Sequence, residues 1–216
     1  MTVVEQLLQM GSQLDRHARP SLIVGVHDDP IVLKYKNHKY HTDQTFNPSV
    51  IHHHTGNLLD SPDNIIAHGC NTLGLMGAGI AAQIKYYNSE LFEAYVEFCE
   101  MQGIEGGLGQ IFIYPTDDKS KLVINCMTQP CLRSRTVPVP FRYHAFVQAW
   151  QSVINFLCQH DVPSISISRI GCSHGGGNFE IVKYIIGKMT PDHITVNIYH
   201  IDQSGVFARG NHNPNR

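Results

Sequence analysis

The feature that most constrains the fold of this chain is the stretch from residue 64 to residue 83, NIIAHGCNTLGLMGAGIAAQ. Its apolar run Ile65–Ala67 predicts a short buried strand, and residues 69–76 are rich in turn formers. Gly77–Ala82 has the composition of a helix that begins with glycines. Free N–H groups and the dipole at such a helix start favour an anion, and the glycines allow a phosphate to approach the backbone closely. The stretch therefore predicts phosphate recognition.

A second unit of the same kind lies near the C-terminus. The alternating apolar residues of Ser164–Arg169 predict a strand, residues 171–177 (GCSHGGG) predict a loop, and Phe179–Met189 predicts a helix. Ligands of open α/β sheets bind at the carboxyl ends of the strands, so we expect the two glycine loops to hold one ligand together. A single phosphate needs one loop, and two loops therefore indicate a diphosphate or a phosphate plus a sugar.

Strand and helix patterns alternate along the rest of the chain, which predicts an α/β three-layer sandwich with a mixed, largely parallel central sheet. Further strands are expected at 49–55, 110–114, 121–127 and 194–201, and further helices at 90–101 and 143–160. Residues 128–142 contain three prolines and three arginines and predict a long loop of the kind that covers a substrate site. We expect an N-terminal appendage at 1–46 (a helix at 2–18 and strands at 22–26 and 31–35), a main domain at 47–202 and a flexible tail at 203–216.

Charge and hydropathy exclude several classes of function. The 216 residues carry a formal net charge of -2, which gives no electrostatic footprint for strong nucleic-acid binding. No stretch approaches the roughly 18 apolar residues of a membrane span, and the N-terminus lacks the apolar core of a signal peptide. We therefore expect a cytoplasmic protein that does not bind membranes.

The six cysteines are scattered without a C-x-x-C pair and are interpreted as reduced packing residues. A cysteine phosphatase would need an arginine six residues after its nucleophile, and Met76 stands six residues after Cys70. Cys70 and Cys172 are accordingly interpreted as small residues that pack beneath the loops. Neighbouring residues of the run His52–His54 would point to opposite faces of a strand, so neither a metal site nor a cofactor is predicted.

The pattern Gly77-x-Gly79-x-x-Ala82 formally matches a dinucleotide-binding fingerprint. In that fold the glycines follow the strand at once, and an acid at the end of a second strand lies about 20 residues further on. Here eight residues intervene after His68, and Glu97 and Glu100 fall in an expected helix. A Rossmann dehydrogenase is therefore disfavoured.

Two polar residues stand where the first strand gives way to the predicted phosphate site. The neutral imidazole of His68 can act as a general acid or base, and the amide of Asn71 can hold a ribose hydroxyl. The alternative is that His68 is a structural histidine satisfied by backbone groups at a strand end. His174, inside the second glycine loop, has a similar but weaker claim to a catalytic role.

Four blocks of sequence, taken in order, resemble the macrodomain, an α/β/α module that binds ADP-ribose. They are Gly56–Leu59 (GNLL), Ile65–Asn71 (IIAHGCN), Met76–Ala81 (MGAGIA) and Arg169–Cys172 (RIGC). Within that family the chain is most similar to the branch of fungal-type ADP-ribose-1''-phosphate phosphatases and terminal ADP-ribose glycohydrolases. The segment Tyr95–Glu100 also resembles the phosphatases.

The resemblance implies an ADP-ribose ligand and a role for each matching position. Asn57 would face adenine, Asn71 would lie near the distal ribose, and His68 would match the histidine proposed as catalytic in the phosphatases. Gly77–Ile80 and Gly171–Gly177 would be the two phosphate loops. The predicted catalytic residues are His68 and His174, and the predicted ligand-binding residues are Asn57, Leu58, Asn71, Met76, Gly77, Ala78, Gly79, Ile80, Gly171, Cys172, Ser173, Gly175, Gly176, Gly177, Asn178 and Phe179.

The chain departs from the glycohydrolases of this branch at two positions. Gln129 and Gly175 stand where those enzymes have a lysine and an aspartate, which argues against their covalent route. The leading hypothesis is therefore a hydrolase that acts on the terminal ribose of an ADP-ribose derivative, most like a 1''-phosphate phosphatase. The alternative is a non-catalytic module that sequesters ADP-ribose, an ADP-ribosylated partner or an ADP-ribose-derived signal, with Arg133, Arg135 and Arg142 setting specificity. Hydrolysis of ADP-ribose from a protein or nucleic acid by other residues stays open.

Overall fold

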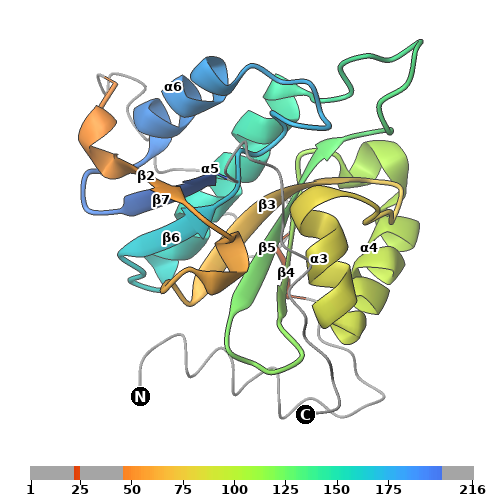
Figure 1. Cartoon of the computed structure of the whole chain (residues 1–216), viewed down its shortest axis with the longest axis horizontal. Coiled ribbons are helices and arrows are strands. Elements are labelled where there is room, and N and C mark those ends of the chain that lie inside the picture. The colour runs from red at the N-terminus through yellow and green to blue at the C-terminus, as the bar shows by residue number, and fades with distance from the viewer. Residues whose placement is uncertain (1–21, 25–45, 201–216) are drawn as a thin grey trace.

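The computed structural model of the chain describes residues 22–24 and 46–200, which form one sheet with helices on both faces (Figure 1). The strands are β1 (Leu22–Val24), β2 (Ile51–Thr55), β3 (Ile65–Asn71), β4 (Ile111–Pro115), β5 (Leu122–Gln129), β6 (Ser164–Ile167) and β7 (Thr195–His200). The α-helices are α3 (Gly79–Tyr87), α4 (Ser89–Gly107), α5 (Tyr143–Gln159) and α6 (Phe179–Met189), and the 3-10 helices are η1 (Pro48–Val50) and η2 (Leu58–Asp60).

The seven strands lie in the order β1-β4-β5-β3-β6-β7-β2. From β5 to β2 all neighbouring strands are parallel, whereas β4 runs antiparallel to both β5 and β1. The sheet is thus mixed and largely parallel, and the predicted fold class is confirmed. Five carboxyl ends of parallel strands meet at one edge, where the ligand was expected. Of the predicted appendage, 1–46, only Leu22–Val24 and Phe46 are described; the helix at 2–18, the strand at 31–35 and the tail at 203–216 lie outside the described residues.

Successive side chains of β3 enter two separate cores, because they point to opposite faces of the sheet. Ile65 and Ala67 are buried with the apolar faces of α5 and α6, and Ile66 and Cys70 are buried with α3 and α4. Figure 1 shows the two helix pairs on opposite sides of the sheet. The predicted stripe of α5 is confirmed, since its six apolar residues are all buried: Phe146, Ala149, Trp150, Val153, Ile154 and Leu157. The result is the predicted three-layer arrangement.

Two element boundaries differ by more than two residues from the sequence prediction. β3 continues through Gly69 to Asn71, where a loop was expected, because it pairs with β5 from Ile65↔Leu122 to Asn71↔Gln129. Neighbouring strands supply the hydrogen bonds that local sequence does not reveal. The helix expected to end near Gly103 has a non-helical residue there (φ 67°) but resumes and ends at Gly107.

Three further observations concern classes of function. No helix among the described residues is long and apolar enough to cross a membrane. All six cysteines are free. Within residues 22–24 and 46–200, no three side chains of the metal-ligating types gather in a way that could hold an ion.

Candidate functional site

A cavity of about 700 Å³ opens at the sheet edge where the parallel strands end. Each of the five strands contributes lining residues at or just beyond its carboxyl end, and α3, α4 and the loop after β5 complete the wall. The lining residues are Gly56, Asn57, Leu58, Gly69, Cys70, Asn71, Leu75, Met76, Gly77, Ala78, Gly79, Ile80, Ala81, Gln83, Lys85, Phe92, Gln129, Leu132, Arg133, Ser168, Arg169, Gly171, Ser173, His174, Gly175 and Tyr199.

The first glycine segment, residues 76–80, leads into a helix start without a side-chain cap. Ala78, the residue before α3, is extended (φ -150°, ψ 161°) and has no side-chain oxygen to accept the first N–H groups of the helix. The helical ladder begins with the Ala82 N–H donating to the Ala78 carbonyl, so the preceding amides lack an acceptor within the helix. A Cβ added at Gly77 would contact nothing within 4 Å. This segment therefore offers unpaired N–H groups to an anion in the pocket.

The second glycine segment, residues 171–177, is closely packed. Gly171 has φ +72°, and a side chain there would overlap the ring of Phe141. The Gly177 N–H donates to the Gly171 carbonyl at 2.9 Å. The helix that follows is already capped, because Asn178 Oδ1 accepts from Glu180 N and Ile181 N. This segment is therefore a closely packed wall whose following helix already has its cap.

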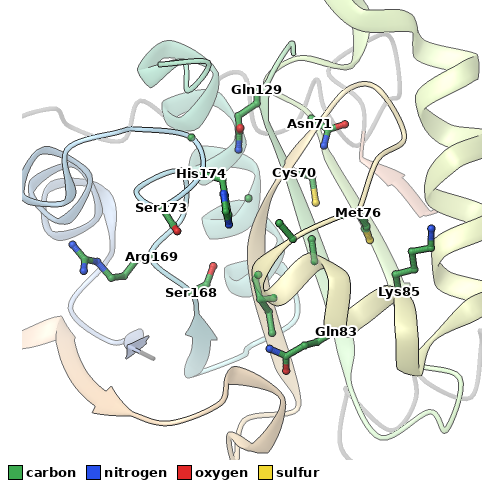
Figure 2. Close-up of a pocket in the computed structure, with 18 of the residues that line it drawn as sticks. Cys70, Asn71, Met76, Gln83, Lys85, Gln129, Ser168, Arg169, Ser173 and His174 are labelled. Atoms are coloured by element: carbon green, nitrogen blue, oxygen red, sulfur yellow. The ribbon is translucent and has the colours of Figure 1, made fainter. Parts of the chain in front are cut away.

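The tip of the second segment lies close to the start of α3, and both line the cavity. Ser173 and His174 are exposed, and a Cβ added at Gly79 would lie 3.9 Å from His174 Cδ2. Figure 2 shows His174, Ser173 and Ser168 on the side of the pocket opposite Cys70 and Met76. The two glycine segments thus border one cavity, as the sequence predicted.

The lining residues carry positive charge. Lys85, Arg133 and Arg169 line the cavity, and no Asp or Glu of the described part of the chain does so. The Arg169 guanidinium lies 4.2 Å from the ring centre of Phe179, and Lys85 Nζ lies 4.0 Å from that of Phe92. A chain with net charge -2 has therefore concentrated cations and open amides in one cavity, which favours an anionic ligand.

The ends of the cavity differ in chemistry. One end, which we call the base end, is lined by Asn57, Leu58 and Tyr199, beyond β2 and on β7, and the Tyr199 ring stacks on that of His54. The other, the sugar end, is lined by Asn71, Gln129, Leu132 and Arg133, where β3 and β5 stop. A flat apolar group suits the base end because aromatic and aliphatic side chains line it, and a polyhydroxyl group suits the amide of Gln129 at the sugar end.

The structure brings together twelve of the predicted site residues and leaves six elsewhere. Lining the cavity are Asn57, Leu58, Asn71, Met76, Gly77, Ala78, Gly79, Ile80, Gly171, Ser173, His174 and Gly175. His68, Cys172, Gly176, Gly177, Asn178 and Phe179 are not lining residues. Cys172 Sγ donates to the Ile170 carbonyl, and burial raises the pKa of its thiol to about 11. Gly176 and Gly177 belong to the second glycine segment, and Asn178 caps α6. The Phe179 ring lies against the Arg169 guanidinium.

The structure places His68 outside the lining of the cavity. The side chain is fully buried on the face of β3 that packs against α3 and α4. Asn125 Nδ2 donates to the Phe112 carbonyl, so Asn125 Oδ1 accepts from His68 Nε2 at 2.8 Å. Burial lowers the pKa of His68 to about 4, which leaves the imidazole neutral. In this structure the His68 side chain links β3 to β5 through Asn125 and does not line the cavity.

Asn71 reaches the cavity, but its amide serves the loop that follows. Its Oδ1 accepts from Leu73 N at 2.9 Å, and its Nδ2 donates to the Leu75 carbonyl at 2.6 Å. For Asn71 to contact a ribose as predicted, these two hydrogen bonds would have to break. In this structure the Asn71 amide instead holds the loop before Met76. Cys70 also lines the cavity; burial holds the pKa of its thiol well above the usual range, so it is not a poised nucleophile.

Several lining residues were not predicted from the sequence. Ser168 and Tyr199 lie at carboxyl ends of parallel strands, so the strand prediction combined with the rule on ligand position could have found them. Lys85 and Phe92 come from the facing sides of α3 and α4 and had no sequence signal. Their presence depends on how the two helices pack.

Comparison with known proteins defines the class. The Macro domain family matches residues 67–186 of this chain. The chain therefore belongs to the Macro domain family, as its sequence blocks had indicated.

Two curated relatives have different activities. The chain is 28% identical over 123 residues to a DNA ADP-ribosyl glycohydrolase of Thermus aquaticus, covering 56% of this chain and 32% of that protein. It is 35% identical over 81 residues to an ADP-ribose 1''-phosphate phosphatase of Candida glabrata, covering 37% of this chain and 45% of that protein. The match therefore spans about a third of the first relative and less than half of the second.

Solved structures share the fold. A protein from Bacteroides thetaiotaomicron superposes with a TM-score of 0.60 at 26% identity, covering 69% of this chain and 98% of that one. The macrodomain of Thermus aquaticus DarG superposes with a TM-score of 0.58 at 25% identity, covering 69% and 97%. Thermosipho africanus DarTG in complex with ADP-ribose, 19% identical with a TM-score of 0.55 over 72% of this chain and 42% of that one, supports the fold alone.

Proposed function

We propose that the pocket binds ADP-ribose, with adenine at the base end, the diphosphate at the start of α3 and the terminal ribose at the sugar end. The observation that carries the proposal is the uncapped start of α3, which lies close to the tip of the second glycine segment and lines the same cavity. Open amides, three cationic side chains and no lining carboxylate suit a diphosphate. Membership of the Macro domain family and the activities named for the curated relatives support the same ligand.

We propose further that the chain hydrolyses the bond to a substituent on the terminal ribose. In such a reaction water adds, the bond to the substituent breaks, and the leaving oxygen takes a proton. His174 carries the one imidazole among the described lining residues, and it is exposed opposite Gly79. The neutral amide of Gln129 and the amides of α3 would orient the reacting groups and hold the developing negative charge. His174 therefore replaces His68 as the catalytic candidate.

A second candidate function is binding without turnover. It is favoured by the absence of a carboxylate from the described lining and by the neutral residues at Gln129 and Gly175. A protein with this pocket would sequester ADP-ribose or a group that carries it, and would need only the diphosphate contacts. The two functions share the ligand and differ in whether His174 affects the rate of hydrolysis.

One experiment separates the two functions. ADP-ribose is titrated calorimetrically into the chain, and hydrolysis is then assayed with ADP-ribose 1''-phosphate and with ADP-ribosylated DNA. Turnover that His174→Ala lowers at least a hundredfold, with the Kd for ADP-ribose changed less than about threefold, supports hydrolysis. Turnover unaffected by His174→Ala contradicts the role of this residue. Binding without turnover supports sequestration, and no binding overturns both candidates.

A further inference from the structure

Beside the base end, a group of basic side chains surrounds one aromatic ring. The Arg169 guanidinium lies 4.2 Å from the ring centre of Phe179, and Lys183 Nζ lies 6.0 Å from it. The imidazole rings of His200 and His53 meet the same ring at 87° and 72°, with ring centres 5.5 and 6.1 Å away. We call these five residues the Phe179 cluster.

The members of the Phe179 cluster come from four parts of the chain and are held by their contacts with one another. His53 Nδ1 and His200 Nε2 lie 2.7 Å apart and share a hydrogen bond that joins β2 to β7. Arg169 follows β6, and Phe179 and Lys183 belong to α6. An arginine that is already stacked on a ring loses less conformational freedom on binding than a free side chain does. The cluster therefore presents Arg169 in a largely fixed position.

Positive charge in the Phe179 cluster is not balanced by acids. Glu180 lies beside the cluster and already pairs with Lys183. Arg169 is exposed, and its guanidinium makes no ion pair with any residue of 46–200. Burial lowers the pKa of His53 and of His200, and nearby positive charges, that of Arg169 among them, lower both further. A bound anion would relieve this repulsion between basic groups.

The Phe179 cluster borders the part of the cavity where the adenosine ribose of the proposed ligand would lie. Arg169 lines the cavity, and so does Tyr199, the residue before His200. In the sheet, β6 lies between β3, which leads to α3, and β7, which carries Tyr199. With adenine at the base end and the diphosphate at the start of α3, the ribose that joins them lies beyond β6, beside Ser168 and Arg169. Figure 2 shows Arg169 extending away from Ser168 and His174, toward the outside of the pocket.

We propose that Arg169, held by the Phe179 cluster, makes the pocket select ADP-ribose that carries a phosphoryl group on the 2'-oxygen of its adenosine ribose. The inference rests on the proposed function, which sets the direction of ADP-ribose in the pocket. A planar guanidinium binds two phosphoryl oxygens at once, and an arginine beside the ribose is one way in which proteins accommodate the 2'-phosphate of a dinucleotide. The ligand class is then 2'-phosphorylated ADP-ribose, which forms when a 2'-phosphorylated nicotinamide dinucleotide loses its nicotinamide.

The test compares two probes that differ only in this phosphoryl group. They are ADP-ribose and ADP-ribose 2'-phosphate, and both are titrated calorimetrically into the wild type and into each variant. Arg169→Gln is compared with Arg135→Gln, which removes the same charge from an exposed position outside the pocket lining. His53→Gln is compared with His52→Gln, because neighbouring residues of β2 point to opposite faces of the sheet.

We expect the wild type to bind ADP-ribose 2'-phosphate about tenfold more tightly than ADP-ribose, as one charge-assisted contact allows. Arg169→Gln should abolish this preference and change the Kd for ADP-ribose less than about threefold. His53→Gln should lower the preference about threefold, because the cluster then holds Arg169 less firmly. Arg135→Gln and His52→Gln should keep all of it. Since the four substituted side chains are exposed, none of the variants is expected to unfold, and their thermal midpoints check this.

Two results would overturn the inference while leaving ADP-ribose binding intact. One is a wild type that does not discriminate between the probes. The other is an Arg169→Gln variant that loses affinity for both probes to the same degree, since Arg169 would then contact the diphosphate. A His53→Gln variant that behaves like His52→Gln would overturn the supporting role of the Phe179 cluster. A wild type that binds neither probe would instead overturn the proposed function itself.

Discussion

The two glycine-rich segments that border the pocket look alike in sequence and use their glycines differently. In residues 76–80 the glycines leave space: Gly77 has no neighbour for a Cβ, and the α3 start has no side-chain cap. In residues 171–177 the glycines allow close packing: Gly171 lies against Phe141, and Asn178 caps α6. One segment is open to a ligand, and the other builds the wall that faces it.

The comparison teaches that glycine content alone does not identify an anion site. What matters is whether the N–H groups at the following helix start already have acceptors. Asn178 supplies acceptors to α6, whereas Ala78 supplies none to α3. Substitutions in residues 171–177 should therefore mainly reduce stability, and substitutions in residues 76–80 should mainly reduce ligand binding.

The largest expected effect is that of Gly171→Ala on stability. The left-handed φ and the overlap with Phe141 together should lower the free energy of unfolding by about 3 kcal/mol, or about 6 °C or more in the thermal midpoint. Gly77→Ala is the matched control, and it should cost less than about 0.5 kcal/mol. Equal losses in the two variants, measured by thermal unfolding, would mean that the segments do not differ as described.

Acidification should lower the free energy of unfolding by nearly as much, because of His68 on the strand that leads into the first segment. The folded pKa of His68, about 4, lies below its unfolded value of 6.5, so the neutral form stabilises the fold above pH 6.5. This contribution is lost as the pH falls from 6.5 toward 4, and it amounts to about 3 kcal/mol.

His68→Gln removes that titration. Denaturant unfolding measured between about pH 7 and pH 4 should show a steeper loss for the wild type than for the variant, by about 3 kcal/mol. Parallel stability curves for the two proteins would contradict the burial of a neutral His68.

Adding a cap to the open helix start should move stability and affinity in opposite directions. Ala78→Asp gives α3 a side-chain acceptor at an extended, exposed position. Its carboxylate should stabilise the fold by about 0.5–1 kcal/mol and weaken ADP-ribose binding by about 2 kcal/mol, or about 30-fold.

Ala78→Asn separates the two causes, because it caps the helix without adding charge. It should stabilise the fold to a similar degree and weaken binding by less than Ala78→Asp does. An Ala78→Asp variant that binds ADP-ribose as tightly as the wild type, by calorimetry, would place the diphosphate elsewhere.

The smallest effect is expected for the cap that already exists. Asn178→Ala removes the acceptor of Glu180 N and Ile181 N and should cost about 1 kcal/mol of stability. The Kd for ADP-ribose should change less than about twofold, since Asn178 stands behind the pocket. A tenfold loss of affinity in this variant would show that the start of α6 also serves the ligand.

Local pattern was enough to predict much of the fold. The helix Phe179–Met189 has the predicted bounds, because Asn178 is a strong cap and the apolar spacing behind it is regular. The stripe of α5 and the meeting of both glycine segments at one sheet edge also followed from periodicity and strand direction.

The candidate site was harder to predict, because its details depend on neighbours in space. His68 looked like a residue at a strand end, and only pairing with β5 shows that the strand continues past it. The amide of Asn71 is occupied by a loop whose conformation the sequence does not reveal. Lys85 reaches the cavity because α3 packs beside α4, a contact between helices that no local pattern encodes.

The most direct test of the central claim is an NMR titration of the ¹⁵N-glycine-labelled chain with ADP-ribose. The proposed function puts the diphosphate at the open amides of the first segment, so Gly77 and Gly79 should show the largest saturable shifts. Gly176 and Gly177, which stand outside the lining, should shift little. Saturable shifts at Gly176 and Gly177 with Gly77 and Gly79 unchanged, or no shifts at all, would contradict the account.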